Sequence, residues 1–268
     1  MSSFARVWRA VPTLLRIGVA ETVAYRAEFL VWILTSTMPL IMLGLWTSVA
    51  SEAPFRTFSS SRFVAYYLSV LIVRHLTSNW VAWQLSEEIR LGVLSMRLLR
   101  PIHPFFSYAA THIAALPFRS LIALPLTFIL LISSGASALS TDPLQLALLL
   151  PSLFFAWLIT FGILFALGCT SFWFTQMFGL FNFYFGVWSL FSGYLLPIAL
   201  LPSWIGRIAE YSPFYAMLGA PIELMTESLT PHQLGVLFAR QALWAVAAVA
   251  TAFWVWRAGV RRFEAVGG

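Results

Sequence analysis

Long apolar stretches separated by short polar segments dominate the sequence. The interval between Asp142 and Arg207 contains no charged residue and is too long for a single soluble core element. About 20 apolar residues already suffice to cross a bilayer. The pattern predicts an all-α polytopic membrane protein with six transmembrane helices: Phe29–Val49, Phe63–Trp83, Phe106–Ser133, Leu144–Leu167, a fifth from a tight turn near Gly168–Ser171 to about Tyr194, and Leu234–Trp256.

The segment before the first predicted span is amphipathic. Between Phe4 and Ala20, three arginines share one face of a helical wheel and apolar side chains share the other. This arrangement is typical of a helix that lies in the membrane interface, although an amphipathic cytosolic helix would show it too. The arginines are Arg6, Arg9 and Arg16, and the apolar side chains are Phe4, Val7, Trp8, Val11 and Leu15.

Prolines interrupt the apolar region between the fifth and sixth spans, residues 195–231. Because proline breaks helices and removes a backbone donor, we expect two short helices that dip into the membrane edge rather than a seventh crossing. If this region faces outward, its prolines are candidates for an outer gate. The candidates are Pro197, Pro202 and Pro213.

The charges are few and unevenly placed. Only 10% of the 268 residues are charged, against about a quarter in soluble domains, and all 16 basic residues are arginine. Most arginines fall in the segments that are cytoplasmic if both termini are inside, as the positive-inside rule expects. We therefore attribute the net charge of +6 to membrane orientation and expect no nucleic-acid partner. Without lysine, the chain has no Walker A phosphate loop.

One short cytoplasmic segment concentrates charge between the second and third predicted spans. The stretch "SEEIRLGVLSMRLLRPIHPF" begins at Ser86, a possible helix N-cap, and its acidic residues follow in the expected first turn. Two prolines would end the helix near Arg100. Positive-inside arginines alone do not account for the acidic pair, the glycine and the proline stop. We therefore expect a helix near residues 86–101 that docks a soluble partner.

This segment resembles the cytoplasmic signature of ABC-2 type exporter permeases. Within that family, the sequence is most similar to the viologen-exporter-like branch. The matching positions are Glu88, Ile89, Gly92, Leu94, Leu98, Leu99, Arg100 and Pro101. An interfacial N-terminal helix, six spans and the proline-rich outer segment agree with the resemblance, which covers nearly the whole chain.

The resemblance implies a single transmembrane domain over residues 1–268, with an interfacial helix (1–27), a six-span bundle (28–258) and a cytoplasmic tail (259–268). It implies a bacterial inner-membrane protein that pairs with a second permease copy or a related permease and contacts membrane lipid. A separate ABC ATPase subunit would bind the ATP and Mg²⁺. The segment expected to couple to that ATPase comprises Glu87, Glu88, Ile89, Arg90, Gly92, Leu94, Leu99, Arg100 and Pro101.

Polar and aromatic residues inside the spans are candidates for a translocation route. An arginine at the bilayer centre costs at least about 2.5 kcal/mol and should face protein or water; a structural role would satisfy the same constraint at Arg74 and at Arg119. A stripe of small and polar residues in the fifth span, flanked by aromatics, marks either close helix packing or the route. The route candidates are Arg74, His75, Thr175, Phe178, Asn182, Phe185 and Ser189.

Two other classes of protein compete with the permease. An ATP-independent secondary transporter or channel usually carries a carboxylate well inside the bilayer, and the six predicted spans contain none. A membrane enzyme needs a catalytic or metal constellation, and the four histidines form no HExxH or similar pair. We therefore expect no catalytic residues and no metal site. The transported substrate stays open, with an amphipathic or drug-like molecule, a lipid-like molecule and a peptide as the classes considered.

Overall fold

The computed structural model describes residues 12–20, 37–174 and 176–263, which form helices and contain no β-strand. Residues 12–20 are helical. The longer elements that follow are α3 (Met38–Val49), α4 (Ser60–Thr77), α5 (Val81–Arg90), α6 (Leu94–Leu98), α7 (Pro104–Gly135), α8 (Pro143–Cys169), α9 (Phe178–Phe191), α10 (Ser203–Tyr211), α11 (Ala220–Thr226) and α12 (Pro231–Val260). Single turns lie between them: η1 (Ala136–Ala138), η2 (Thr170–Phe172), η3 (Ile198–Leu200) and the π-helical η4 (Tyr215–Gly219).

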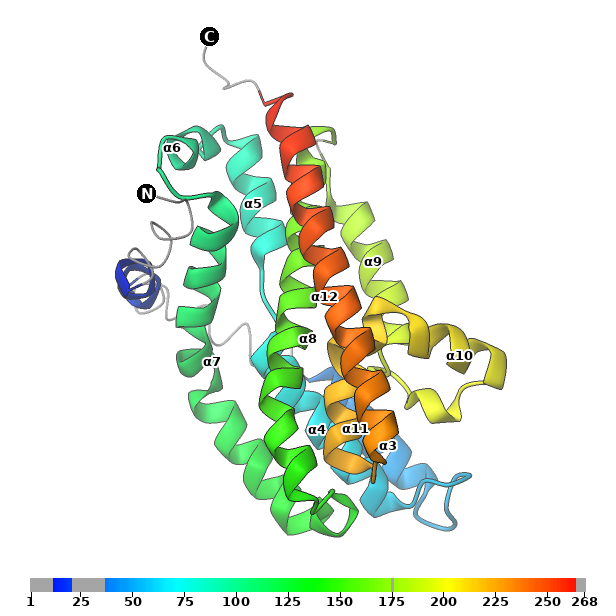
Figure 1. Ribbon diagram of the computed structural model, residues 1–268. Helices are drawn as coiled ribbons and strands as arrows, with labels where there is room; N and C mark the ends of the chain where they lie inside the picture. Colours follow the sequence, from blue (N-terminus) through cyan, green and yellow to red (C-terminus); the bar gives the residue numbers. More distant parts are fainter. Residues whose placement is uncertain (1–11, 21–36, 175, 264–268) are drawn as a thin grey trace.

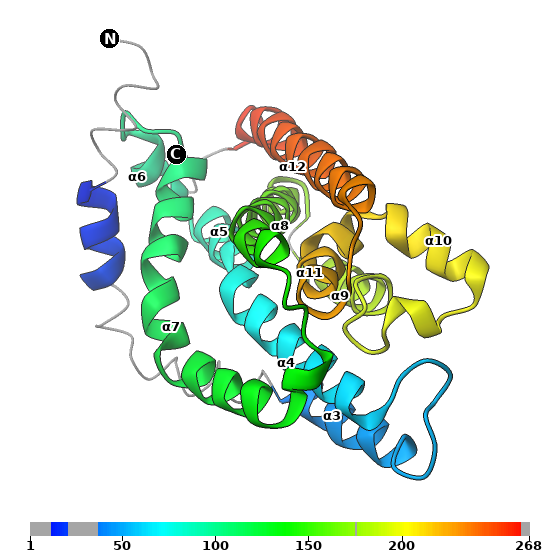
Figure 2. The same cartoon turned by 60° about the horizontal axis from the view of Figure 1, so that its bottom comes forward.

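Helix α8 occupies the middle of the bundle, with α4, α5, α11 and α12 around it (Figure 2). Its most extensive contact is with α12, which runs beside it for most of its length (Figure 1). The two backbones approach closely at Gly162, where a Cβ atom would lie 3.0 Å from the backbone carbon of Ala248. Small residues at such a crossing are typical of packed membrane helices.

Two helical stretches in the described part of the chain are long and apolar enough to cross a membrane on their own, residues 143–172 and α12. They confirm the fourth and sixth predicted spans. Helix α7 matches the third span and has 32 residues, with Pro117 and Pro125 inside it. Helix α3 matches the second half of the first span, whose earlier residues lie outside the described part.

The second predicted span is not one continuous helix. It divides at residues 78–80 into α4 and α5, and α5 extends to Arg90, beyond the predicted end at Trp83. Ser78 adopts an extended conformation, and the side-chain Oδ1 of Asn79 accepts a hydrogen bond from the backbone N–H of Val81. Short polar side chains offer the backbone such alternatives to helical hydrogen bonds, which explains why the helix is interrupted there.

The fifth predicted span is shorter than expected. Helix α9 begins at Phe178 rather than soon after Ser171, and it ends at Phe191, followed by a turn at Gly193 with φ of +87°. Its 14 residues span about 21 Å at 1.5 Å per residue, less than the roughly 30 Å hydrocarbon core. A full crossing here therefore needs the non-helical residues on either side.

The proline-rich segment forms short helices, as predicted. Pro202 directly precedes α10, and Pro221 lies in the first turn of α11, positions where a missing N–H costs little. Two buried glutamines hold the segment to the bundle. Gln145 donates to the backbone carbonyl of Glu227, and Gln241 donates to that of Ala216 in the π-helical turn.

The helix of residues 12–20 lies beside α7 and across the long axis of the bundle (Figures 1 and 2). Gly18 is buried, and a Cβ there would lie 2.8 Å from the Cβ of Ala114 on α7. Arg16 is exposed. A helix that lies across the bundle axis with its arginine exposed is what we expect of an interfacial helix. The earlier part of the predicted helix, Phe4–Val11, with Arg6 and Arg9, lies outside the described residues.

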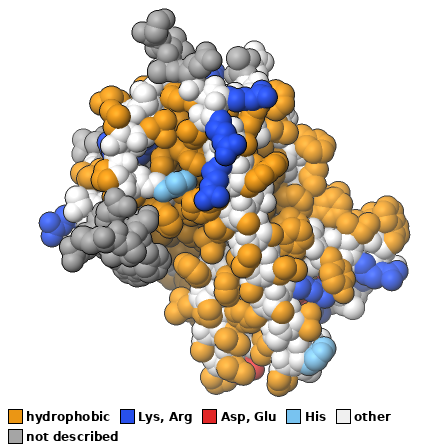
Figure 3. All heavy atoms as spheres, turned by 45° about the horizontal axis from the view of Figure 1, so that its top comes forward, with side chains coloured by type: hydrophobic (Ala, Val, Ile, Leu, Met, Phe, Trp, Pro, Cys, Tyr) orange, Lys and Arg blue, Asp and Glu red, His pale blue; other side chains and the backbone are white. Residues whose placement is uncertain are grey.

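The surface of the bundle is largely apolar. Figure 3 shows one face on which hydrophobic side chains predominate. Highly exposed side chains on three different helices include Leu121 at 71%, Leu150 at 75% and Val246 at 69% exposure. Such a surface is excessive for a soluble protein and suits contact with lipid. The chain is therefore an all-α, multi-pass membrane protein.

Candidate functional site

Helices α5 and α6 form a tight hairpin at one end of the bundle (Figure 1). Gly92 makes the turn with a φ of +72°, a conformation that glycine adopts without the strain other residues incur. The hydroxyl of Ser95 donates to the carbonyl of Gly92 and closes the turn. We call residues 87–101 the coupling hairpin, after the role that the sequence predicts for this segment.

The structure corrects the predicted boundaries of this segment. Ser86 is not an N-cap: it lies inside α5, is buried, and accepts a hydrogen bond from the Ser171 hydroxyl at 2.7 Å. Glu87 and Glu88 are accordingly near the end of α5 and not in a first turn. The single helix expected near residues 86–101 is two helices, because the glycine turn interrupts it. The proline stop is confirmed, since α6 ends before Pro101.

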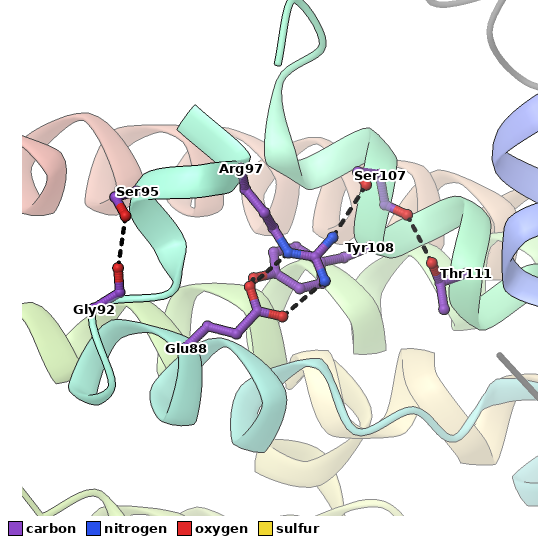
Figure 4. Close-up of polar contacts among 7 residues, drawn as sticks. All are labelled: Glu88, Gly92, Ser95, Arg97, Ser107, Tyr108 and Thr111. Carbon is purple, nitrogen blue, oxygen red and sulfur yellow. Dashed lines mark hydrogen bonds and ion pairs between the residues drawn. The ribbon is translucent and has the colours of Figure 1, made fainter. Parts of the chain in front are cut away.

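An ion pair braces the coupling hairpin from inside (Figure 4). The carboxylate of Glu88 accepts hydrogen bonds from Arg97 Nε at 2.5 Å and Nη2 at 2.7 Å, and from the hydroxyl of Tyr108 at 2.6 Å. Arg97 also donates to Ser107 and stacks over the Tyr108 ring. Both charged side chains are less than one-fifth exposed. Bidentate pairing of this kind is strong and directional, so α5, α6 and α7 are fixed relative to one another.

The outer surface of the hairpin is apolar at its tip. Four large side chains are at least half exposed: Leu91 (63%), Val93 (50%), Met96 (64%) and Leu99 (81%). Exposed charged side chains border them at Glu87, Arg90 and Arg100, whereas Ile89 and Leu94 are buried and anchor the hairpin to the bundle. An exposed apolar patch with a charged border is typical of a protein-binding surface.

The predicted polar residue of the second span, Arg74, lies among aromatic rings. Its guanidinium is 4.9 Å from the ring centroid of Tyr194, 5.0 Å from that of Trp188 and 5.9 Å from that of Phe185. Cation–π contacts of this kind stabilise an arginine that has been removed from water. The structure therefore brings Arg74 and Phe185 together.

The other route candidates have separate surroundings. The ring of His75 hydrogen-bonds to the carbonyl of Leu71 on its own helix. Ser189 is buried and donates to Gly186 within α9. Phe178 is exposed and contacts Trp83. Thr175 and the side chain of Arg119 lie outside the described residues.

The first part of the small-residue stripe on α9, from Gly179 to Gly186, is exposed, whereas Ser189 further along it is buried. A Cβ placed on Gly179 or Gly186 would meet no atom within 4 Å, and Asn182 between them is exposed. Close packing against the described residues therefore does not explain these two glycines. This part of the stripe is free to face lipid, a second subunit or an aqueous route.

No group of three or more His, Cys, Asp or Glu side chains in the described part of the chain is arranged to hold a metal ion. The residues predicted for the outer gate mark helix starts. Pro197 directly precedes η3, Pro202 precedes α10, and Pro213 opens the helical stretch that continues into η4 and α11.

No curated protein matches the sequence significantly. A family model described as an ABC-2 family transporter protein matches residues 30–267. This match covers the spans, the coupling hairpin and the proline-rich segment together. The chain therefore belongs to the ABC-2 family of transporter proteins, as a membrane permease component.

Proposed function

We propose that this chain is the transmembrane subunit of an ATP-driven exporter in the bacterial inner membrane, with both termini in the cytoplasm. The coupling hairpin docks a separate ABC ATPase, which binds ATP and Mg²⁺ and hydrolyses the nucleotide. Two permease copies, or this permease and a related one, form the route for an amphipathic or drug-like molecule. The resemblance to the viologen-exporter permeases supports this class of substrate.

The observation that carries this proposal is that the coupling hairpin has both an exposed apolar tip and an internal ion pair that makes it rigid. Movement of an ATPase can be transmitted only through a contact that binds it and does not deform. The tip residues around Leu99 provide the binding surface, and the Glu88–Arg97 pair provides the rigidity. The arginines at the end of α12, Arg257 and Arg261, lie at the same end of the bundle, which supports a cytoplasmic location by the positive-inside rule.

The exposed stripe on α9 supports a dimer. Gly179, Asn182 and Gly186 have no packing partner in the described chain, and exposed aromatic side chains such as Phe178 border them. A second permease would cover part of this face, and the remainder would line the route. Aromatic walls suit flat or cationic molecules through stacking and cation–π contacts.

The test is purification of the tagged permease from its native host, followed by identification of the co-purified proteins and measurement of ATP hydrolysis. We expect an ABC ATPase to co-purify with the wild type and with Leu99→Met, which keeps the apolar surface. Leu99→Asp should lose most of the ATPase because a charge would be buried in the contact.

Two results would overturn the proposal. One is equal recovery of the ATPase with Leu99→Asp and Leu99→Met. The other is transport that continues after ATP is depleted, which would favour the ATP-independent transporter instead.

A further inference from the structure

A cavity of about 540 Å³ opens at the end of the bundle opposite α6. We call it the distal cavity. Its walls come from the start of α4, the η3 turn, α10, η4, α11 and the first turns of α12, so a single permease chain builds all of the described lining (Figure 1). Its volume falls in the range of pockets that hold drug-sized molecules.

Charged side chains of both signs line the distal cavity, and most of them already have partners. Arg62 forms an ion pair with Glu227 and also lies over the Phe58 ring. Arg240 stacks over the ring of Tyr211, 4.2 Å from its centroid. The two guanidinium groups are thus engaged by the protein itself.

Glu223 is the exception among the half-buried carboxylates of the distal cavity. Its side chain forms no hydrogen bond or ion pair with any residue that the structure describes, and it lines the cavity from α11. Burial is the main cause of a raised pKa for this carboxyl, to about 7, with further contributions from Glu227 and Glu210 and an opposing one from Arg240. A half-buried carboxylate that forms no direct ion pair or hydrogen bond is costly, and a cation bound against it in the cavity would reduce that cost.

We propose that the distal cavity binds an organic cation with an apolar body, and that the positive group of the ligand pairs with Glu223. The lining suits both parts of such a molecule. Tyr66, Tyr215 and Ile222 supply apolar and aromatic surface. The carboxylates outnumber the guanidinium groups by three to two, since Glu210 joins Glu223 and Glu227.

Two other ligand classes fit less well. An anion would meet an excess of carboxylates, and both cavity arginines already have partners, Arg62 in Glu227 and Arg240 in the ring of Tyr211. A metal ion needs several convergent ligands, and no such group occurs among the described residues. The expected ligands all carry an ammonium or related cationic group. This group belongs either to a free amphipathic molecule or to a lipid headgroup.

This binding site goes beyond the proposed function and does not depend on an ATPase. It is therefore tested on the full-length permease alone, purified in an uncharged detergent, with ethidium as the fluorescent cation. Wild type should bind ethidium saturably, and Glu223→Gln should weaken binding about tenfold or more, the effect of losing one charge-assisted contact. Glu52→Gln is the matched control, because Glu52 is an exposed carboxylate outside the cavity.

A second variant separates binding from folding. Val236→Trp fills the distal cavity from α12 without changing charge and should also abolish binding. Each variant is compared with wild type by thermal unfolding, so that only folded protein is scored.

Acidification should weaken binding as Glu223 takes up its proton, by about tenfold between pH 8 and pH 6 for a pKa near 7. The other charged and titratable side chains that line the cavity are Arg62, Tyr66, Glu210, Tyr215, Glu227, His232 and Arg240. The pH dependence should disappear in Glu223→Gln, which assigns it to Glu223 rather than to His232.

Phosphatidylethanolamine, added in a separate arm, identifies the source of the cation. Displacement of ethidium by the lipid indicates a headgroup site, and unchanged binding indicates a site for free cations. The proposal is overturned if wild type shows no saturable binding, or if folded Glu223→Gln binds ethidium as tightly as Glu52→Gln. Neither result would affect the coupling-hairpin assignment, because no ATPase takes part in this experiment.

Discussion

Arg97 donates two hydrogen bonds to Glu88, nine residues earlier in the chain and on the opposite side of the Gly92 turn. The pair joins α5 to α6 directly, and Tyr108 extends the same contact to α7. A hairpin held only by its turn would be free to bend at Gly92. With the pair in place, force applied to α6 is carried to two longer helices.

Removing the carboxylate charge of Glu88 should loosen the coupling hairpin. We expect Glu88→Gln to lower the free energy of unfolding by roughly 1–3 kcal/mol, because Arg97 would keep a largely buried charge without its counter-ion. Chemical unfolding of the purified permease measures this change. Glu87→Gln is the control, since Glu87 is exposed and adjacent. Equal stability of the two variants would contradict a structural role for the pair.

Gly92 should be replaceable only by residues that tolerate a left-handed backbone. A β-branched residue at this position would have a strained backbone, because its φ would have to be +72°. Gly92→Val should cost roughly 1–3 kcal/mol and reduce ATPase recovery, whereas Gly92→Asn should come closer to wild type. Co-purification of the ATPase distinguishes the two. Wild-type recovery with Gly92→Val would show that the turn geometry is unimportant for docking.

His103 should make the folded protein sensitive to acid. Its ring accepts a hydrogen bond from the backbone N–H of Phe105 and contacts Phe253, and burial, followed by the charge of Arg257, lowers its pKa to about 4. Because this value lies below the ordinary 6.5, the unfolded chain binds the proton more readily. Stability should therefore be fully present above pH 6.5 and decline as the pH falls toward 4.

The variant His103→Asn tests this assignment, because asparagine can still accept the hydrogen bond but does not titrate. We expect its melting temperature to fall less than that of wild type between pH 7 and pH 5. Parallel decline of the two proteins would assign the acid sensitivity to other groups.

Arg74 should be more important for transport than for folding. Arg74→Met removes a charge from an aromatic environment but keeps an apolar side chain there, so we expect a stability change within about 1 kcal/mol. If the guanidinium lines the route, substrate-stimulated ATP hydrolysis by the assembled transporter should change severalfold. Arg207→Met, on the exposed side of α10, should leave it unaltered. Normal stimulation with Arg74→Met would remove Arg74 from the route.

The end of the bundle that contains the distal cavity should face outward. Ser203 and Ser228 are exposed there, and the native Cys169 is buried. Cysteines introduced at either position should react with an impermeant thiol reagent added to intact cells, and the wild type should not react. Reaction only after the cells are opened would reverse the orientation of the whole permease.

The sequence predicted the helical architecture better than the helix ends. Apolar length is a strong signal, and α8 and α12 agree with it because each is a continuous apolar helix. The break at Ser78 was missed because one extended residue and a side-chain contact from Asn79 leave no mark on an average hydropathy. The late start of α9 had a weak signal in the sequence, since Ser171, Thr175 and Gln176 make the residues before Phe178 more polar than those after it.

The residues of the candidate site could be predicted where their role depends on neighbours in the sequence. They could not be predicted where their role depends on contacts with distant parts of the chain. Glu88 stands out because charge is rare in this chain, and Gly92 because it lies within the one short segment where charges gather. Arg97 was not among the predicted coupling residues, and its role depends on a contact across the turn and on Tyr108 in the next helix. The opposed charges of Glu88 and Arg97 within one short loop were the signal that could have suggested the pair. The sequence gives no sign of the surroundings of Glu223, because its cavity is assembled from six separate elements.

The interruption at residues 78–80 separates two bodies that a single helix would have made one. Helix α4 packs mainly on α7 and α3, whereas α5 packs mainly on α8. Arg74 and its aromatic rings lie one turn before the interruption, and the coupling hairpin lies beyond it. In the proposed transporter, this short extended link would let α5 move together with the coupling hairpin while α4 stays packed on α7 and α3. A displacement of α5 would then reach the last turn of α4, beside Arg74, without bending a continuous helix.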